Sequence, residues 1–219
     1  MTEIIFIGSG AVSAEITSYI TDINRVAGTT IYQVKRYLDD SEESYTTNAK
    51  KYQFNAPYLG TIKDHTFSTE EHYAFGLASI AVRRMFIDRL AGSELEFPNI
   101  IHPSAIIADS AVLGKGNVIY PNSVVGPGVV IGDHNLITSY SFVSHDCRIG
   151  ENNFLSTAGL AGNVIMGNDN FMGIRATIIP SISIGSGNTI QAGMVVSNNV
   201  SDQETVFFKY KEKISIIRN

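Results

Sequence analysis

Aliphatic residues recur at every sixth position from Ile101 to Leu155, and the same spacing resumes at Leu160 and continues to Val196. The residue after each aliphatic is often glycine, and the fourth residue after it has a small or narrow side chain. A helix repeats about every 3.6 residues and a strand every two, so neither explains a period of six. A solenoid does, because each repeat needs one inward aliphatic side chain and one corner that tolerates glycine.

The repeat predicts a parallel β-helix in which three hexapeptides form one triangular coil. Each side would be a short strand, and successive coils would stack about 4.8 Å apart, so that stability comes from stacking. The expected coils are residues 101–118, 119–136, 137–154, 155–171 and 172–189, with a partial coil after them. The fourth coil is one residue short between Leu155 and Leu160, which predicts a distorted corner that is either functional or a harmless variant.

The first part of the chain predicts an α/β unit. An apolar run, Glu3–Ile7, reads as a buried parallel strand, and it is followed by Gly8, Ser9 and Gly10 and then by helical spacing from Ala11 to Ile23. This order can cradle a phosphate, because glycines let the backbone approach and a helix N-terminus favours an anion. The third glycine of the dinucleotide fingerprint is missing, so a tight turn in an ordinary α/β domain is an equal alternative.

A second strand is expected at about Ile31–Leu38, and it ends in Asp39 and Asp40. An acidic residue at this place often contacts a ribose or a base. The alternative is a solvated turn, because Ser41, Glu42 and Glu43 follow.

A short strand near Tyr58–Gly60 and a helix over about Leu77–Leu90 complete this part, with Arg83, Arg84 and Arg89 expected on the polar side of the helix. Gly92 and Pro98 mark a linker. We therefore predict two domains, residues 1–95 and residues 96–219.

Composition narrows the class of protein. The chain has 219 residues, a net charge of −5 and no basic run, so nothing indicates a nucleic-acid surface. Its apolar runs are too short to span a membrane, and the N-terminus, with Glu3, does not read as a signal peptide. A single cysteine excludes an internal disulfide framework. We expect a soluble cytoplasmic protein.

Several segments together resemble the nucleotide-aminosugar N-acetyltransferases, which join an N-terminal Rossmann-like βαβαβ domain to a C-terminal left-handed parallel β-helix. Sialic-acid O-acetyltransferases share that layout. The segments that carry the resemblance are Ile4–Gly10, Tyr37–Asp40, Ala81–Arg83, His102–Ala105, Ser144–Gly150 and Ala161–Val164. The handedness of the β-helix comes from this resemblance and not from the composition.

The resemblance implies a fold class of α/β plus all-β and an acetyl-CoA-dependent transferase that forms a homotrimer and needs no metal. The acceptor would be the amine of a UDP- or dTDP-linked amino-deoxy sugar, of the 4-amino-4,6-dideoxyhexose type, for a bacterial surface glycan. A sugar O-acetyltransferase is the main alternative. In the family the small domain holds the nucleotide, so that Gly8, Ser9, Gly10, Asp39 and Asp40 become the expected sugar-nucleotide contacts.

Position within the repeat singles out His145 among the five histidines. It lies two residues after the inward Val143, at a corner, where the coil below has Pro127 and the coil above has Gly162. Asp146 follows directly and is placed to orient the imidazole, as a carboxylate does in a triad. The alternative is an ordinary surface histidine, but the stretch matches the family's His-acid-Cys signature. We therefore assign catalysis to His145 and Asp146.

The expected chemistry is acyl transfer to an amine. A neutral imidazole, with an ordinary pKa of about 6.5, can take the proton of the amine while the nitrogen attacks the thioester. The oxyanion needs a donor, and by the resemblance the backbone N–H of Gly162 is the candidate. The same resemblance places Ile174, Ala192 and Gly193 along the pantetheine arm of coenzyme A, in a site shared by two neighbouring subunits.

Three other residues have simpler interpretations. His102 precedes a proline at the start of the solenoid and is expected to cap it, and His134 is expected to be solvated in a turn. Cys147 is expected in the core rather than as a nucleophile.

The chain departs from the family in several places. The first glycine turn carries no histidine, and Phe154 replaces a second histidine that is common in the repeat after the catalytic one. The usual Gly-x-Pro-Ala-Lys segment is absent, which puts the contacts to the far end of coenzyme A in doubt. Lys209, Lys211 and Lys213 would neutralise its phosphates or form a solvated basic tail.

Two further alternatives are weaker. A zinc lyase of the γ-type carbonic anhydrase class uses three histidines on this kind of solenoid and has no first domain of this type. A non-catalytic scaffold leaves the His-Asp pair unexplained.

Overall fold

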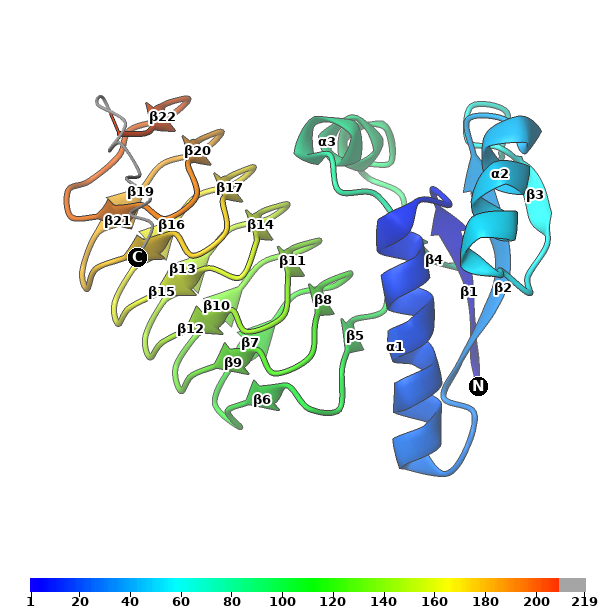
Figure 1. The fold of residues 1–219 in the computed structure, drawn as a ribbon, viewed down its shortest axis with the longest axis horizontal. Helices are drawn as coiled ribbons and strands as arrows, with labels where there is room; N and C mark the ends of the chain where they lie inside the picture. Colours follow the sequence, from blue (N-terminus) through cyan, green and yellow to red (C-terminus); the bar gives the residue numbers. More distant parts are fainter. Residues whose placement is uncertain (209–219) are drawn as a thin grey trace, which may run out of the picture.

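The computed structural model describes residues 1–208 and joins an α/β unit to a long solenoid (Figure 1). The α/β unit contains β1 (Thr2–Ile7), α1 (Ala11–Ala27), β2 (Tyr32–Asp39), α2 (Glu42–Tyr52), β3 (Tyr58–Thr61), β4 (His72–Phe75) and α3 (Ile80–Arg89). Its four strands are parallel, in the order β3-β2-β1-β4. The Rossmann-like βαβαβ arrangement predicted from the sequence is confirmed.

Strand β1 is buried on both faces, as its continuous apolar run predicts. Ile4 and Phe6 pack with residues of α1 and β2 on one face of the sheet. Ile5 and Ile7 pack on the other face with Phe86 of α3. The helices therefore cover both faces of this small sheet, and α3 lies on the face opposite α1.

Two elements of this unit carried no clear sequence signal. Helix α2 has no fully buried residue, and its half-buried side is short, with Tyr45, Ala49 and Tyr52, so its apolar signal is weak. The helix begins directly after Ser41, in the segment for which a solvated turn was the alternative. The Ser41 hydroxyl caps the helix by accepting the Ser44 N–H at 3.1 Å. Strand β4 is only four residues long and begins with His72.

The solenoid consists of three parallel sheets of seven, six and five two-residue strands. The first sheet contains β5 (Ile100–Ile101), β8 (Val118–Ile119), β11 (Leu136–Ile137), β14 (Phe154–Leu155), β17 (Phe171–Met172), β20 (Thr189–Ile190) and β22 (Thr205–Val206). The second contains β6 (Ile106–Ile107), β9 (Val124–Val125), β12 (Phe142–Val143), β15 (Gly159–Leu160), β18 (Thr177–Ile178) and β21 (Val195–Val196). The third contains β7 (Val112–Leu113), β10 (Val130–Ile131), β13 (Arg148–Ile149), β16 (Ile165–Met166) and β19 (Ser183–Ile184).

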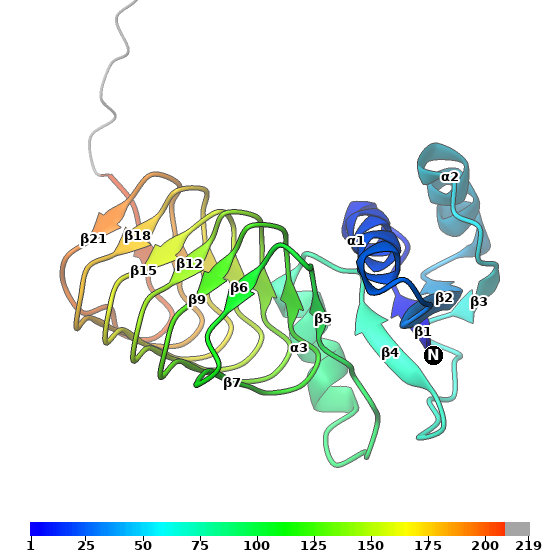
Figure 2. The same ribbon diagram turned by 90° about the horizontal axis from the view of Figure 1, so that it is seen from below.

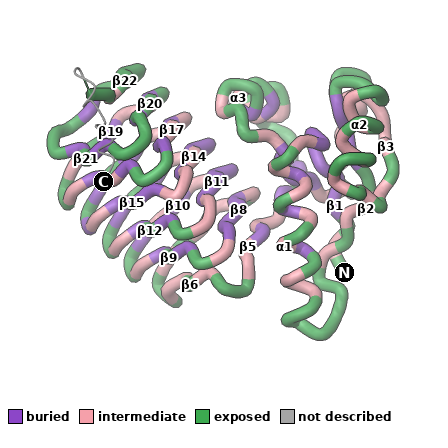
Figure 3. The backbone as a smooth tube through the Cα atoms, in the orientation of Figure 1, coloured by how far each residue is buried: buried purple, intermediate pink, exposed green. Residues whose placement is uncertain are grey.

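The aliphatic residue of each hexapeptide is the second residue of its strand, and these side chains form the continuous core of the left-handed β-helix. Figure 2 shows the coils stacked one behind another, with the α/β unit at the N-terminal end of the stack. Figure 3 shows buried segments along the strands and exposed segments at the corners. The period of six is thus confirmed as a coil with three sides. Within residues 1–208, no helix has both the length and the apolar character that a membrane crossing requires.

The short fourth coil is also confirmed. Paired residues in the coils before it are 18 positions apart, as in Val124 and Phe142. Pairs that span the short corner are 17 apart, namely Phe142 with Gly159, Arg148 with Ile165 and Phe154 with Phe171. The shortened corner holds Thr157 at a φ of 47°. The ring of Phe142 occupies the space in which a side chain of Gly159 would lie. The missing residue therefore changes both the corner and the surface of the second sheet.

A column of buried asparagines runs along one interior corner of the solenoid. Above the half-buried first member, Asn99, the backbone N–H of each member donates to the side-chain oxygen of the asparagine one coil below, at 2.8–2.9 Å. The column contains Asn99, Asn117, Asn135, Asn153, Asn170 and Asn188. These are among the narrow positions of the repeat. Asparagine is suited to them because its amide satisfies buried backbone groups that would otherwise lack partners.

The α/β unit packs against the first sheet of the solenoid. Outward side chains of Ile100, Val118 and Leu136 are buried in one cluster with Ile16 and Ile20 of α1. In Figure 1, α1 lies between the small sheet and the solenoid. His102, expected only to cap the solenoid, accepts the Ser104 N–H at 3.1 Å and also lies 3.2 Å from the carboxylate of Asp22 in α1.

Two expectations about exposure are wrong. Arg83 is not on a solvated face but only 2% exposed, because that side of α3 docks on the corners of the solenoid. His134 is not solvated but 7% exposed, and its ring packs edge-on against Phe75 and Phe97, with centroids 5.3 and 4.8 Å away. Both contacts join residues far apart in sequence, so the local pattern did not reveal them.

The buried His134 predicts a pH-dependent stability. Burial lowers the pKa of its imidazole from 6.5 to about 4. The unfolded chain therefore binds this proton first, so the stabilisation is complete above about pH 6.5 and is lost as the pH falls toward 4. We expect the free energy of unfolding to fall by about 3 kcal/mol across this window from this group alone.

Denaturant unfolding of the wild type and of His134→Asn across this pH range measures the effect. Asparagine is the suitable replacement because residue 134 has a φ of 58°, a conformation that asparagine tolerates. The free energy of unfolding of the variant should not fall in this way. The difference in stability between wild type and variant at neutral pH should therefore shrink as the pH is lowered. Parallel pH profiles for the two proteins would contradict the assignment.

Candidate active site

His145 lies at the corner between β12 and β13, with its side chain 55% exposed. Its Nδ1 is 2.8 Å from Oδ2 of Asp146. A carboxylate only accepts hydrogen bonds, so this contact places the proton of the neutral ring on Nδ1. Nε2 is then left without a proton, and it is the atom that can act as a base.

The imidazole and the carboxylate each lie beside a glycine of a neighbouring coil. A Cβ on Gly162 would be 2.5 Å from Nε2 of His145, so the ring lies directly over that glycine. A Cβ on Gly128 would be 2.6 Å from Oδ1 of Asp146. The main chain is fixed as well, because Asp146 N–H donates to Pro127 and the His145 carbonyl accepts from Asn163, both at 3.0 Å. The pair is therefore held in place from both sides.

Gly162 also offers a hydrogen-bond donor. Its carbonyl accepts the Ser181 N–H at 3.0 Å, whereas its own N–H has no backbone partner within residues 1–208. Because Gly162 lies next to Nε2 of His145, this N–H is the candidate donor to an oxyanion there. The structure thus brings together the three residues that sequence analysis assigned to the chemistry of transfer.

Cys147, which follows the pair, is fully buried in the solenoid core, as expected. Burial raises the pKa of its thiol, which disfavours the thiolate that a nucleophile requires.

The predicted nucleotide residues meet at the carboxyl edge of the small parallel sheet. Ser9 is fully buried, and both its N–H, at 2.9 Å, and its hydroxyl donate to Oδ2 of Asp39. The other oxygen of Asp39 accepts the Asp40 N–H at 2.8 Å. Gly8 has a φ of 98° and is packed against Leu77, so that no larger residue fits there.

The five predicted nucleotide residues differ in how accessible they are to a ligand. Asp39 is 8% exposed and stabilises the glycine turn, whereas Asp40 and Gly10 remain open to solvent or partly so. A carboxylate already lies at the start of α1, which is unfavourable for a phosphate at the same point. Nucleotide binding by these residues stays a prediction, and Asp40 and Gly10 are the members free for direct contact.

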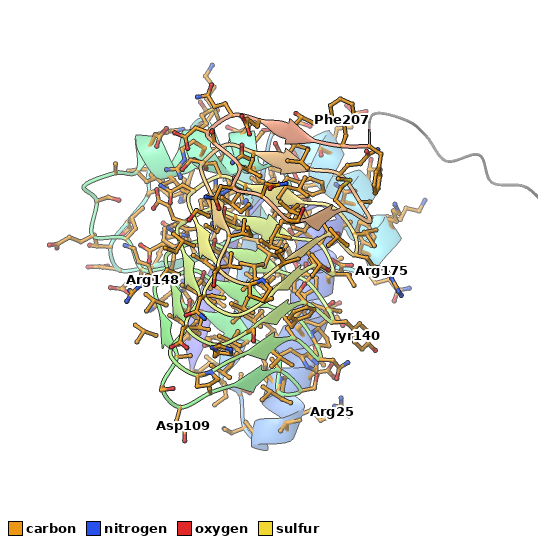
Figure 4. All side chains as sticks on the ribbon, turned by 90° about the vertical axis from the view of Figure 1, so that its left-hand side faces the viewer. Arg25, Asp109, Tyr140, Arg148, Arg175 and Phe207 are labelled. Atoms are coloured by element: carbon orange, nitrogen blue, oxygen red, sulfur yellow. The ribbon has the colours of Figure 1, made fainter. Side chains whose placement is uncertain are left out.

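The predicted coenzyme A residues lie at a different corner, between the first and second sheets. Ile174 is 57% exposed, and its carbonyl accepts the Gly193 N–H at 2.8 Å, so the two residues stack on successive coils. Ala192 is exposed beside them. The same edge carries Tyr140 and Arg175, which project together in Figure 4.

A surface cleft with a volume of about 410 Å³ lies on this edge and was not expected from the sequence. It is lined by Tyr140, Phe142, Thr157, Ala158, Gly159, Arg175 and Thr177. The cleft contains the shortened corner of the fourth coil. The one sign of this cleft in the sequence is Phe142, an aromatic residue at an outward position of the repeat. This residue is 42% exposed.

Two sets of predicted residues therefore occupy separate corners of one chain. The set around His145 lies between the second and third sheets, and the set around Ile174 lies between the first and second. Within residues 1–208, no three His, Cys, Asp or Glu side chains converge on a position suited to a metal ion. Lys209, Lys211 and Lys213 lie outside the residues that the structure describes.

Comparison with known proteins supports the sequence resemblance. Residues 110–145 match the family described as bacterial transferase hexapeptide (six repeats). No curated protein sequence is significantly similar to the chain. Solved structures, in contrast, match over nearly its whole length.

One is the acetyltransferase domain of PglB from Neisseria gonorrhoeae in complex with acetyl coenzyme A, with 25% identity, a TM-score of 0.76 and coverage of 93% of this chain and 94% of that one. PerB from Caulobacter crescentus, in complex with CoA and GDP-perosamine, has 23% identity, a TM-score of 0.75 and coverage of 94% and 93%. WeeI from Acinetobacter baumannii has 19% identity, a TM-score of 0.75 and coverage of 94% and 96%. The two-part layout and the hexapeptide repeat are thus confirmed.

Proposed function

We propose that the protein transfers an acetyl group from acetyl-CoA to the amine of a nucleotide-linked amino-deoxy sugar. The observation that carries this proposal is the placement of His145. Its Nδ1 is held by Asp146 at 2.8 Å, and its Nε2 lies over Gly162, whose N–H is free among the described residues. A base and an oxyanion donor side by side are what acyl transfer from a thioester requires.

The reaction follows from this geometry. The sugar amine attacks the thioester carbonyl while Nε2 of His145 takes its proton, and Asp146 stabilises the imidazolium that forms. The carbonyl oxygen becomes an oxyanion and accepts the N–H of Gly162. When the intermediate collapses, the new C–N bond stays and the C–S bond breaks. The proton on His145 then passes to the leaving thiolate, which gives an amide and coenzyme A.

The related structures support the choice of substrates. The PglB domain, at 25% identity, binds acetyl coenzyme A, and PerB binds CoA and GDP-perosamine, a nucleotide-linked sugar. In this chain the α/β unit would hold the nucleotide through Gly10 and Asp40. Ile174, Ala192 and Gly193 would line the path of the pantetheine arm. Acetyl-CoA and nucleotide sugars are cytoplasmic metabolites, so we assign the reaction to the cytoplasm.

We also propose that the site is completed in a homotrimer. The corner with His145 and the corner with Ile174 are separate in one chain, and a neighbouring subunit would bring them together. The second sheet between them exposes apolar side chains, with Ile106 64% and Val195 63% exposed, as expected of a surface that another subunit covers. Sedimentation at micromolar concentration should give a mass near three chains. A monomer under these conditions contradicts the shared site.

A coenzyme A release assay tests the proposed reaction. The panel contains 4-amino and 3-amino deoxy sugars linked to UDP, dTDP or GDP, each beside the matching hydroxyl sugar. We expect release with at least one aminosugar, none with its hydroxyl counterpart, and an N-acetyl product by mass spectrometry. Release only with hydroxyl sugars would replace the proposal by an O-acetyltransferase. No release with any acceptor would overturn it.

A further inference from the structure

Helix α3 is attached to the solenoid by a buried arginine, Arg83, that forms no ion pair with a carboxylate of residues 1–208. Nη1 of Arg83 donates to the His134 carbonyl at 3.2 Å, and Nη2 donates to the carbonyls of Asn152 and Asn153, both at 3.5 Å. The side chain is only 2% exposed. Asn152 returns a contact, because its Nδ2 donates to the Ile80 carbonyl at the start of α3 at 3.1 Å. Arg83 therefore connects α3 with the backbone of two successive coils.

Arg84 extends this attachment by one coil. Its guanidinium is 2.8 Å from Glu151 and 2.9 Å from Asp169. Glu151 belongs to the same coil as His145, and Asp169 belongs to the coil that contains Gly162. The two arginines thus hold the coils that carry the proposed base and oxyanion donor.

The same helix is linked to the glycine turn of the α/β unit. Leu77 lies shortly before α3 and fills the space beside Gly8. A Cβ added to Gly8 would be 2.5 Å from the Leu77 side chain. Ser13 of α1 donates to the Gly8 carbonyl at 2.6 Å and to the Gly76 carbonyl at 3.3 Å. A continuous set of contacts therefore runs from the predicted nucleotide turn through α3 to the coils around His145.

From this chain of contacts we infer that Arg83 and Arg84 are positioning residues, which fix the distance between the bound nucleotide and the transfer site. The inference rests on the proposed function. A nucleotide held by the α/β unit contributes to the transfer only if its attached sugar amine arrives within reach of Nε2 and the thioester. Because strand pairing joins each coil to the next, this holds whether the amine reaches His145 of the same chain or of a neighbour.

An arginine is suited to this role for a geometric reason. Its planar guanidinium presents several donors in a fixed fork, so one side chain can bind carbonyls of two coils. A lysine would offer one ammonium at a single point. The burial of a charge without a carboxylate partner does not indicate a contribution to stability, since an apolar residue of similar volume is often tolerated equally well at such places.

The test compares two acceptors for wild type and Arg83→Met. One is the nucleotide-linked aminosugar that the release assay identifies, and the other is the methyl glycoside of the same aminosugar, which lacks the nucleotide. The ratio of their kcat/KM values measures what the α/β unit contributes. We expect Arg83→Met to lower this ratio on the order of 10²-fold, the effect of a displacement of about 1 Å. The rate with the glycoside should stay unchanged, because that acceptor does not use the α/β unit.

Three further variants control the result. Arg83→Lys should restore part of the ratio, because one ammonium can still reach one carbonyl, and Arg84→Met should lower the ratio in the same direction. Arg89→Met, on the same helix, should behave as wild type. The Arg89 guanidinium donates to the Lys63 carbonyl and lies over the Phe67 ring, so its contacts are within the α/β unit. If Arg83→Met does not fold, Arg83→Lys and Arg84→Met decide the question.

The possible outcomes separate the two proposals. Equal losses with both acceptors indicate a general structural role and overturn the inference, as does an unchanged ratio in Arg83→Met and Arg84→Met. Absence of transfer by the wild type to either acceptor would contradict the proposed function itself. A loss confined to the nucleotide-linked acceptor supports the positioning role.

Discussion

Replacing His145 with alanine is expected to lower kcat by about 10²–10⁴, the usual contribution of a general base. The fold should be unaffected, because the side chain is 55% exposed at a corner and makes no contribution to the solenoid core. Affinity for coenzyme A should change little, since the predicted contacts around Ile174 lie at another corner. Steady-state kinetics with the nucleotide-linked aminosugar, with circular dichroism as a check on folding, measures the effect.

Asp146→Asn serves as the matched variant. It should cost less than His145→Ala, because Asp146 orients the imidazole and does not transfer the proton. Raising the pH should partly rescue His145→Ala, since more of the sugar amine is then deprotonated in solution. Near-native turnover of His145→Ala at neutral pH would show that this histidine is an ordinary surface residue.

The second large effect is expected at Gly162. A methyl group there would lie 2.5 Å from Nε2 and 2.6 Å from Cε1 of His145, so Gly162→Ala must displace the imidazole from its place over the corner. We expect kcat to fall on the order of 10²-fold, because misplacing a reacting group by about 1 Å has an effect of that size. The melting temperature should change little, since the exposed ring can move into solvent.

A double-mutant cycle tests whether Gly162 acts through His145. In the His145→Ala background there is no ring to displace, so adding Gly162→Ala should have a much smaller effect than it has in the wild type. Ser144→Ala, at the adjacent position of the same corner, is the control and should keep wild-type turnover. Additive losses in the cycle would refute a steric route through the imidazole.

The solenoid and the transfer site were predictable because their information is local. One aliphatic residue in every six is a periodic signal, and it gave the strands, the coils and the short corner before Gly159. His145 and Gly162 occupy equivalent positions on successive coils. The repeat therefore places them next to each other from sequence alone.

The α/β unit was predictable only in part. Strand β1 and helix α1 carry clear apolar patterns, whereas α2 has no fully buried residue and leaves only a weak pattern to detect. The role of Asp39 was not evident either, because its bond to Ser9 joins residues 30 positions apart.

The sequence by itself determined the solenoid, the strand-turn-helix start and the His-Asp pair at a corner, because each depends on neighbouring residues or on a fixed repeat. Only the tertiary structure decided how the α/β unit is attached. Arg83 and His134 look like solvated residues in their local sequence, and both are buried where α3 meets the coils. Their environment comes from segments that are distant in the sequence, from Phe97 beside His134 to Asn153 beside Arg83, and no local pattern of polar and apolar residues records such a contact.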